Sequence, residues 1–569
     1  MINDLRERIA VARGHRKADL VIRGGRIVNV FSGAIERRDV AVHRGKVVGL
    51  GPYDGKTVID ASSKIILPGF IDSHVHLESS LLVPAEFVKA ALPRGVTGVV
   101  ADPHEIANVL GREGIRYFLR ATGGLPLDFY FMLPSCVPAS RLETSGARLS
   151  SASLATFLRH ERVLGLAEMM NYPGVLAADR DVLRKLARFG GRPMDGHAPG
   201  LSGRDLMAYV GAGISSDHEC ITAKEAREKA GLGMTVYIRE GSAAKDLEAL
   251  LPAVNPSNAR SFCLCTDDLQ AGDLLLGSID QMIRKAVGLG LEPVTAVRMA
   301  TLNPALHFDL RGKGAVAPGY DADLVVIDNF DRLTVEMVFK KGRLVARGGR
   351  VRVPVRHIDH PSTKNTVNIP EFDVSRVRLK ARGDRARVIE LIPRQIETRQ
   401  AVLPVRARAG LVISDRSRDI LKLLVVERHR SSGNIGIGLV KGFGLSSGAL
   451  ASTIAHDSHN IIAVGVDDAD IHQAVVEIGR MHGGMVVVDR GKVLARLPLP
   501  VAGLMSEKPA ATVAKKINEV RQAARRLGTR IEEPFSALSF LALPVIPALK
   551  LTDRGLVDVN RFTFVDLFV

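Results

Sequence analysis

Tryptophan is absent from this chain of 569 residues, and tyrosine and cysteine are scarce, with seven and four copies. So few aromatic side chains leave little surface on which nucleic-acid bases can stack. No C-x-x-C pair occurs among the cysteines, which are Cys136, Cys220, Cys263 and Cys265. We therefore expect reduced thiols, and the sequence argues against a disulfide framework, a thiolate zinc site and a deaminase of the Pro-Cys-x-x-Cys type.

Long apolar runs are also missing. The longest uncharged stretch, residues 534–549, is shorter than the roughly 18 residues of a membrane span and is broken by Pro544 and Pro547. The N-terminus is charged from Asp4 onward and lacks the apolar segment of a secretory signal. We expect a cytoplasmic protein without a membrane partner.

Acidic residues are outnumbered, because 78 Lys and Arg face 61 Asp and Glu and give a formal net charge of +17. Such an excess can attract nucleic acid, so a non-catalytic nucleic-acid-binding protein is one alternative. Much of the excess lies between residues 376 and 408, and we interpret residues 373–409 as a solvated basic linker. With few aromatic rings to stack bases, we expect no nucleic-acid partner.

The composition, 46% hydrophobic and 24% charged, indicates a globular protein of several domains. Residues 19–60 and 314–351 both contain short alternating runs punctuated by Gly and Asp, the pattern of small antiparallel strands. Between them, residues 64–310 alternate buried-type strands with amphipathic helices, which indicates a parallel sheet. Residues 410–569 mix apolar alternation with helical stretches and are expected to form a separate α+β domain.

The middle region contains eight predicted strands, and most carry a His, Asp or Glu at or just past the carboxyl end. A (β/α)8 barrel builds its active site from the carboxyl ends of its strands, so this pattern predicts a TIM-type barrel. The strands are expected at residues 69–78, 96–102, 129–134, 164–169, 192–198, 214–219, 234–240 and 262–268.

The first of these strands ends in His74-Val-His76. Residues i and i+2 of a strand project to the same side, so both imidazoles can bind one ion in the barrel mouth. An H-x-H pair alone is a weak signal. Four more ligand-type side chains stand at the ends of later strands and strengthen the prediction of a metal centre: Glu168, His197, His218 and Asp267.

Several motifs resemble a known family. Residues 68–78, Pro-Gly-Phe-Ile-Asp-Ser-His-Val-His-Leu-Glu, resemble the amidohydrolase superfamily of metal-dependent barrel hydrolases. Residues 100–109, Val-Ala-Asp-Pro-His-Glu-Ile-Ala-Asn-Val, and the segments around Glu168, His197 and His218 are similar to its bacterial adenine deaminase branch. The resemblance covers essentially the whole chain, because residues 446–460 are similar to the extra C-terminal domain of that branch.

This resemblance implies a division of the chain into domains. Residues 1–63 and 311–372 would form a composite β-sandwich domain, with the strands of 19–60 and 314–351 paired in one small sheet. Residues 64–310 would form the (β/α)8 catalytic barrel, and residues 410–569 the C-terminal α+β domain.

The resemblance also implies a ligand set. His74, His76 and Asp267 would hold one divalent ion, His197 and His218 would hold a second, and Glu168 would bridge them. Mn²⁺ or Fe²⁺ is favoured, and Zn²⁺ is an alternative, because all three accept imidazole and carboxylate ligands. The fourth strand offers Glu168 and no lysine, which fits the deaminase branch better than relatives with a carbamylated lysine.

The implied reaction is hydrolytic deamination of adenine to hypoxanthine and ammonia, a step of purine salvage. Asp267 is expected to carry the water proton to the leaving amine, and Glu168 to share the site. His104, Glu105 or Glu240 is expected to protonate a ring nitrogen or read the purine edge, with helix capping or loop packing as the alternative for each. Another amidohydrolase, acting on a cyclic amide or N-acyl substrate, is the nearest competing interpretation.

A dense polar cluster, residues 456–460, follows the small-residue run 446–455. One interpretation makes Asp457 or Ser458 a turn cap with exposed histidines. The other places this loop over the barrel mouth, where His459 would give a hydrogen-bond donor to the purine. Metal chemistry needs no such extra domain, so the domain indicates a lid or an assembly surface, and we expect a homo-oligomer.

Overall fold

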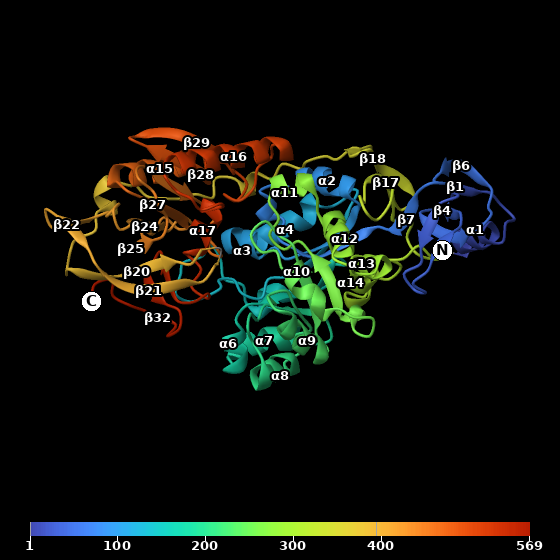
Figure 1. Cartoon of the computed structure of the whole chain (residues 1–569), viewed down its shortest axis with the longest axis horizontal. Coiled ribbons are helices and arrows are strands. Elements are labelled where there is room, and N and C mark those ends of the chain that lie inside the picture. The colour runs from blue at the N-terminus through green and yellow to red at the C-terminus, as the bar shows by residue number, and fades with distance from the viewer. Residues whose placement is uncertain (1, 394) are drawn as a thin grey trace.

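The computed structural model describes residues 2–393 and 395–569. Three parts lie in a row: the N-terminal sheets at one end, a ring of strands and helices in the middle, and the C-terminal sheet at the other end (Figure 1). Within the described residues, no helix is long and apolar enough to cross a membrane.

Two sheets pack together at the N-terminal end, after helix α1 (Ile2–Ala12). The first has the order β5-β4-β1-β6 and comprises β1 (Ala18–Arg23), β4 (Val40–His43), β5 (Lys46–Leu50) and β6 (Gly55–Asp60). The second has the order β19-β18-β17-β16-β7-β2-β3. It draws strands from both flanks of the barrel sequence: β2 (Arg26–Val28), β3 (Ile35–Arg37), β7 (Ile65–Pro68), β16 (Leu324–Ile327), β17 (Val335–Lys340), β18 (Arg343–Arg347) and β19 (Arg350–Val351).

The two flanks therefore do not form the one small sheet that we expected. Only β2, β3 and β7 join the strands from beyond the barrel, with β7 paired antiparallel to β16, and the boundary at residue 63 moves to Pro68. Two sheets that face each other bury the apolar side chains between them. Their shared core contains Ile22, Val42, Ile66, Leu324 and Phe339.

All eight strands predicted for the middle region are present and parallel. They form two arcs, ordered β12-β11-β10-β9-β8 and β13-β14-β15. Hydrogen bonds join the arcs at both ends, from Ser215 N to Met194 O and between Asp267 and the backbone of His74 and His76. The result is a curled parallel sheet of TIM-like form, built from β8 (Phe70–Val75), β9 (Val96–Ala101), β10 (Asp128–Leu133), β11 (Val163–Met169), β12 (Met194–Gly196), β13 (Ser216–Asp217), β14 (Thr235–Arg239) and β15 (Phe262–Cys265).

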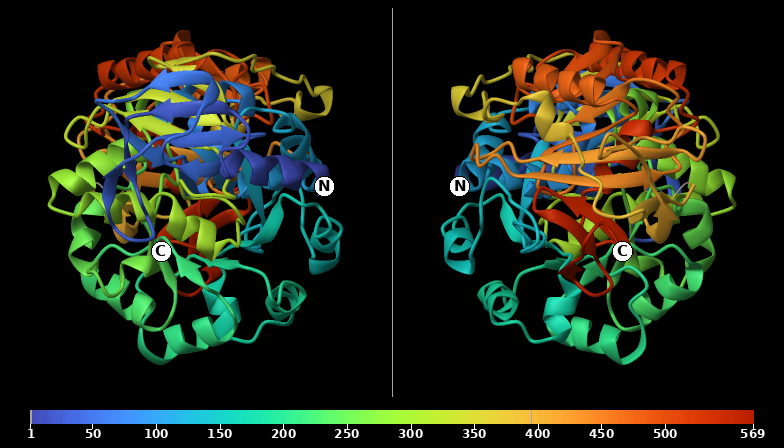
Figure 2. Two further views of the ribbon diagram at one scale, coloured as in Figure 1. Left: turned by 90° about the vertical axis from the view of Figure 1, so that its right-hand side faces the viewer. Right: turned by 90° about the vertical axis from the view of Figure 1, so that its left-hand side faces the viewer.

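Helices from the connections between these strands, and from the segment after β15, surround the curled sheet (Figure 2). Their inward faces join the apolar core of the barrel, as Val88, Phe118, Leu206 and Ile283 illustrate. They are α2 (Pro84–Ala91), α3 (His104–Leu110), α4 (Arg112–Ala121), α5 (Ser151–Ala155), α6 (Tyr172–Leu176), α7 (Arg180–Arg188), α8 (Gly203–Gly211), α9 (Ala223–Gly231), α10 (Leu247–Leu250), α11 (Ala271–Leu276), α12 (Ile279–Gly288), α13 (Pro293–Met299) and α14 (Leu302–His307).

The C-terminal part is an eight-stranded sheet between two long helices. Its order is β21-β20-β25-β24-β27-β26-β28-β29. Helix α15 (Asp468–Arg480) packs on one face and α16 (Ala510–Arg526) on the other, because they share separate cores with alternate residues of the strands. The strands are β20 (Arg385–Leu391), β21 (Thr398–Pro404), β24 (Ile420–Val426), β25 (Ile435–Lys441), β26 (Ala449–Ser452), β27 (Ile461–Gly465), β28 (Gly484–Asp489) and β29 (Lys492–Pro498).

Smaller elements complete this part of the chain. Strands β22 (Arg406–Arg408) and β23 (Leu411–Ile413) form a hairpin, and β30 (Leu549–Thr552), β31 (Gly555–Asp558) and β32 (Thr563–Phe564) form a three-stranded sheet. Helix α17 (Pro534–Phe540) follows α16 and precedes β30 in the sequence. Hydrogen bonds from Asn460 Nδ2 to Thr144 O (2.8 Å) and from Thr144 N to Asp553 Oδ1 (2.8 Å) tie the C-terminal part to a barrel loop after β10.

The basic linker predicted for residues 373–409 is wrong. Apart from residue 394, which lies outside the described residues, this segment contains β20, β21 and β22, and the first two belong to the C-terminal sheet. Ala386, Val388 and Ile389 of β20 are buried, whereas Arg385 is exposed and Arg387 partly exposed. The arginines alternate with apolar residues at the period of a strand, so a high density of charge coexists with a buried face.

Candidate metal centre

The six ligand-type residues predicted from the sequence lie together at the carboxyl ends of the barrel strands. His74 and Glu168 are in β8 and β11. His76, His197 and His218 directly follow β8, β12 and β13, and Asp267 lies two residues after β15. Most are nearly fully buried, and His197 is the most accessible, with 17% of its side chain exposed. The structure thus brings all six into one interior cluster.

His74, His76 and Asp267 form one group of donors. The Nε2 atoms of the two histidines lie 3.1 Å apart, and Asp267 Oδ1 lies 3.4 Å from His74 Nε2 and 3.2 Å from His76 Nε2. Bonds of about 2.0–2.2 Å to one ion place neighbouring ligand atoms about 3.0–3.4 Å apart. The spacing of this group therefore fits a single divalent ion.

Glu168 connects this group to a second one. Its Oε1 atom lies 3.3 Å from His76 Nε2, while its Oε2 atom lies 2.7 Å from His197 Nδ1 and 3.3 Å from His218 Nε2. Oε1 thus faces His76, and Oε2 faces His197 and His218. Glu168 therefore lies between the two groups of histidines.

The electrostatics of the cluster balance anionic oxygens against imidazoles. Burial opposes ionisation of Glu168, but the nearby His218 and the hydrogen bond from His197 outweigh it and hold the pKa of this carboxyl well below its usual value. Burial likewise opposes a charge on His218, but Glu168 raises the pKa of this imidazole well above its usual value. Without metal, the cluster attracts protons, and a divalent ion in each group would take their place.

Arg239 supports the cluster from β14, and sequence reasoning missed it. Its guanidinium hydrogen-bonds Glu219 and donates from Nη1 to Asp267 Oδ2 (3.2 Å). Asp267 itself has φ 56°, a left-handed backbone conformation that non-glycine residues rarely adopt. Such strain is typical of a functional site, and here the hydrogen bonds between Asp267 N and His74 O and between His76 N and Asp267 O hold the residue in place.

The residues predicted to act on the purine ring have different surroundings. His104 Nδ1 lies 3.1 Å from Asp102 Oδ2 and 3.4 Å from Glu168 Oε1, so His104 borders the cluster. Glu105 Oε1 lies 3.2 Å from His456 Nδ1, and burial, followed by the carboxylates of Glu78 and Asp268, raises the pKa of Glu105 well above its usual value.

Glu240 is engaged elsewhere. Both of its carboxylate oxygens accept hydrogen bonds from Lys285 Nζ at 2.9 Å, and Oε1 also accepts from Leu247 N (3.0 Å) at the start of α10. The Glu240 carboxylate is thus already engaged by the Lys285 ammonium group and by a backbone N–H at the start of α10. The structure does not bring Glu240 to the six ligands.

Comparison with known proteins agrees with this geometry. The amidohydrolase family model matches residues 65–345, and the model of the adenine deaminase C-terminal domain matches residues 395–563. Adenine deaminase 2 of Carboxydothermus hydrogenoformans is 47% identical over 99% of this chain and 99% of its own. The chain belongs to the adenine deaminase family. The adenine deaminases of Desulfatibacillum aliphaticivorans (48% identical, 100% of both chains) and Methanothrix thermoacetophila (49% identical, 99% of both chains) match equally completely.

His459, the residue expected to donate to the purine, lies inside the C-terminal part of this adenine deaminase family member. It is 0% exposed, its Nδ1 accepts a hydrogen bond from Ala455 N (3.4 Å), and its carbonyl accepts one from Arg428. His456 Nδ1 lies 3.2 Å from Glu105 Oε1, and a ring nitrogen of His459 lies within 4.8 Å of the same carboxylate. The loop thus brings both histidines toward Glu105, and His456 makes the shorter contact.

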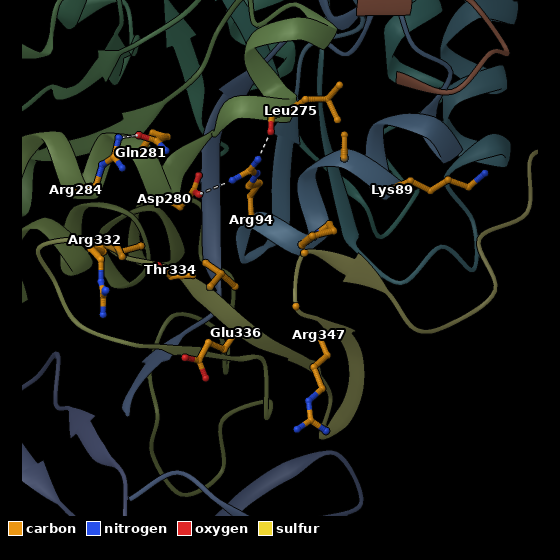
Figure 3. A pocket seen from close by; sticks show the side chains of 16 residues that line it. Lys89, Arg94, Leu275, Asp280, Gln281, Arg284, Arg332, Thr334, Glu336 and Arg347 are labelled. Atoms are coloured by element: carbon orange, nitrogen blue, oxygen red, sulfur yellow. Dashed lines mark hydrogen bonds and ion pairs between the residues drawn. The ribbon is translucent and has the colours of Figure 1, made fainter. Parts of the chain in front are cut away.

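A cavity of about 570 Å³ lies elsewhere in the molecule, between α12 and the strands β17 and β18 (Figure 3). Arg94 projects into it, hydrogen-bonds the carbonyl of Leu275, and lies 3.8 Å from Asp280. None of the six ligand residues lines this cavity. It is therefore separate from the metal centre.

Proposed function

We propose that the protein hydrolyses adenine to hypoxanthine and ammonia, a reaction of purine salvage. The observation that carries the proposal is the cluster of six ligand-type side chains, five of them buried, at the carboxyl ends of the strands. Adenine deaminases match the chain over 99–100% of its length. The relatives are named adenine deaminases, and this name points to the substrate.

His74, His76 and Asp267 are proposed to hold one divalent ion, His197 and His218 a second, and Glu168 both. The donors are imidazole nitrogens and carboxylate oxygens, which favours Mn²⁺ or Fe²⁺, with Zn²⁺ as an alternative. The donor spacing supports this assignment. When bound, such ions make water nucleophilic at neutral pH.

Asp267 is proposed to accept the proton of the attacking water and deliver it to the leaving amine, which departs well only when protonated. The hydrogen bond from Arg239 to Asp267 Oδ2 fixes the orientation of this carboxylate. Glu105 is proposed to protonate a ring nitrogen. It is better placed than His104, because Asp102 and Glu168 already engage the His104 ring.

We also propose that the two N-terminal sheets act as one composite domain, since they share a core across the barrel sequence. Self-association through the C-terminal part is a further proposal. Sedimentation of the purified protein would measure it.

An assay with a panel of substrates tests the proposed function. Protein purified with Mn²⁺ or Fe²⁺ is expected to release ammonia and form hypoxanthine from adenine, with two metal ions per chain. Folded, metal-loaded protein that opened a cyclic amide but left adenine untouched would contradict the substrate. Tight, salt-sensitive binding to DNA without hydrolysis would favour a nucleic-acid-binding protein instead.

A further inference from the structure

The segment of residues 455–460 connects β26 to β27 and lies against the barrel. Loops ordinarily run over the surface of a protein, yet five of these six residues are buried. The exception is His456, whose side chain is 13% exposed. The segment therefore presents one accessible side chain from an otherwise buried position.

Arg428, two residues after β24, holds this segment from the C-terminal side. Its guanidinium is fully buried and, among the described residues, donates only to uncharged acceptors of His459, Thr366 and Ala502. A buried charge is costly unless it is fully hydrogen-bonded. These bonds therefore restrict the backbone positions of His459, Thr366 and Ala502. His429 adds a contact of 2.7 Å between its Nε2 atom and Ser458 O.

The barrel holds the same segment from the other side. The Ser458 hydroxyl donates to the carboxylate of Glu143, and Asn460 Nδ2 donates to Thr144 O (2.8 Å). Glu143 and Thr144 belong to the long loop after β10. The position of the segment is thus set jointly by both parts of the molecule.

Held in this way, His456 lies beside the residues proposed to act on the purine. Its Nδ1 atom is 3.2 Å from Glu105 Oε1, and its ring stacks on Phe540, with 4.8 Å between the centroids and 22° between the planes. The next residue, Asp457, has its Oδ1 atom 4.0 Å from His104 Nε2. A pair of flat rings next to a carboxyl group suits a flat heteroaromatic ring with nitrogen atoms along its edge.

We propose that the C-terminal domain completes the substrate pocket. In this proposal the His456 ring contacts the purine, Phe540 packs against the His456 ring, and Glu105 lies beside His456. Arg428 is a positioning residue, which acts through the segment that carries His456. This inference rests on the proposed deamination of adenine. It gives the C-terminal domain a direct part in substrate recognition, in addition to any part in assembly.

Kinetics and binding of the full-length, Mn²⁺-loaded protein test the inference. His456→Ala is expected to raise KM for adenine and to weaken binding of the product hypoxanthine by about tenfold each, the scale of one ring contact. Metal content and melting temperature should match those of the wild type. Phe540→Leu should also raise KM. The matched control is His15→Ala, at an exposed position near the N-terminus, which should change neither KM nor hypoxanthine binding.

Arg428→Lys keeps the charge but loses the forked set of donors, so it should raise KM more than it lowers kcat. If that variant fails to fold, His456→Ala still decides the question. Unchanged KM and hypoxanthine binding in His456→Ala would overturn the inference, and so would loss of bound metal, which would make His456 a ligand. Absence of adenine turnover in the wild type would overturn the proposed function and the inference with it.

Discussion

Replacing Asp267 with Asn separates proton transfer from metal binding. In the structure, Oδ1 faces His74 and His76 at 3.4 and 3.2 Å, and Oδ2 accepts a hydrogen bond from Arg239 at 3.2 Å. An asparagine that keeps its oxygen toward the two histidines must turn its NH₂ group toward the Arg239 guanidinium. That geometry replaces a charge-assisted hydrogen bond by two opposed donors and costs about 1.5–3 kcal/mol of stability.

The catalytic effect should be larger. Asn cannot accept the water proton, so kcat should fall by about 10²–10⁴, the range of a general acid–base contribution. Ammonia release at saturating adenine measures kcat, and elemental analysis of the same sample measures metal content. Metal loss should be smaller than in His74→Ala, because the amide introduced by Asp267→Asn would retain an oxygen ligand.

A matched control is available in Asp280→Asn. Asp280 is also a buried barrel carboxylate, accepting a hydrogen bond from Ser278 N (2.7 Å), but it lines the separate cavity. The Asp280→Asn variant should have a lower free energy of unfolding and an unchanged kcat. Turnover close to that of the wild type in a fully metal-loaded Asp267→Asn variant would refute the proton-transfer role.

Two further predictions concern the flanking sheets and the loop after β10. Truncation at Ile59 removes most of the first sheet together with β2 and β3, so it should expose β7 and the shared core and give aggregated protein; a soluble, active protein beginning at Ser63 would contradict the composite domain. Burial, against the hydrogen bond from Ser458, raises the pKa of Glu143 from 4.5 to about 8. Between these two pH values the folded state binds more protons than the unfolded state, so this contribution to stability is full at low pH and falls as the pH rises toward 8. Glu143→Gln should flatten that decline in denaturant titrations, and an unchanged slope would show that another group causes it.

The ligand cluster could be predicted because its signal is local. Each ligand stands at the end of an apolar strand, and the rule that barrel strands share one carboxyl face brings distant residues together. The H-x-H spacing adds the orientation of His74 and His76, since alternate residues face the same side. Neither step requires knowledge of a long-range contact.

The remaining features depended on register or on contacts between distant segments. Glu240 was predicted as a site residue, whereas its neighbour Arg239 contacts the cluster. Adjacent residues of an extended chain point to opposite sides, so an error of one residue selects the wrong side. In the supposed linker, counting charge over a window concealed the alternation of Arg385, Arg387 and their buried neighbours. Nothing near His456 in the sequence indicates that Glu105, more than 300 residues earlier, will lie against it.

The antiparallel pairing of β7 with β16 sets an order of events during synthesis. Strand β7 leaves the ribosome long before Leu324 and its neighbours, and at about 5–20 residues per second the intervening chain of about 250 residues takes about 10–50 s to make. During that interval β7 is paired only along its edge with β2, and the core shared by the two sheets lacks Leu324 and Phe339. The barrel must therefore form while the first sixty or so residues wait, exposed to chaperones and to other nascent chains, for the segment that covers them.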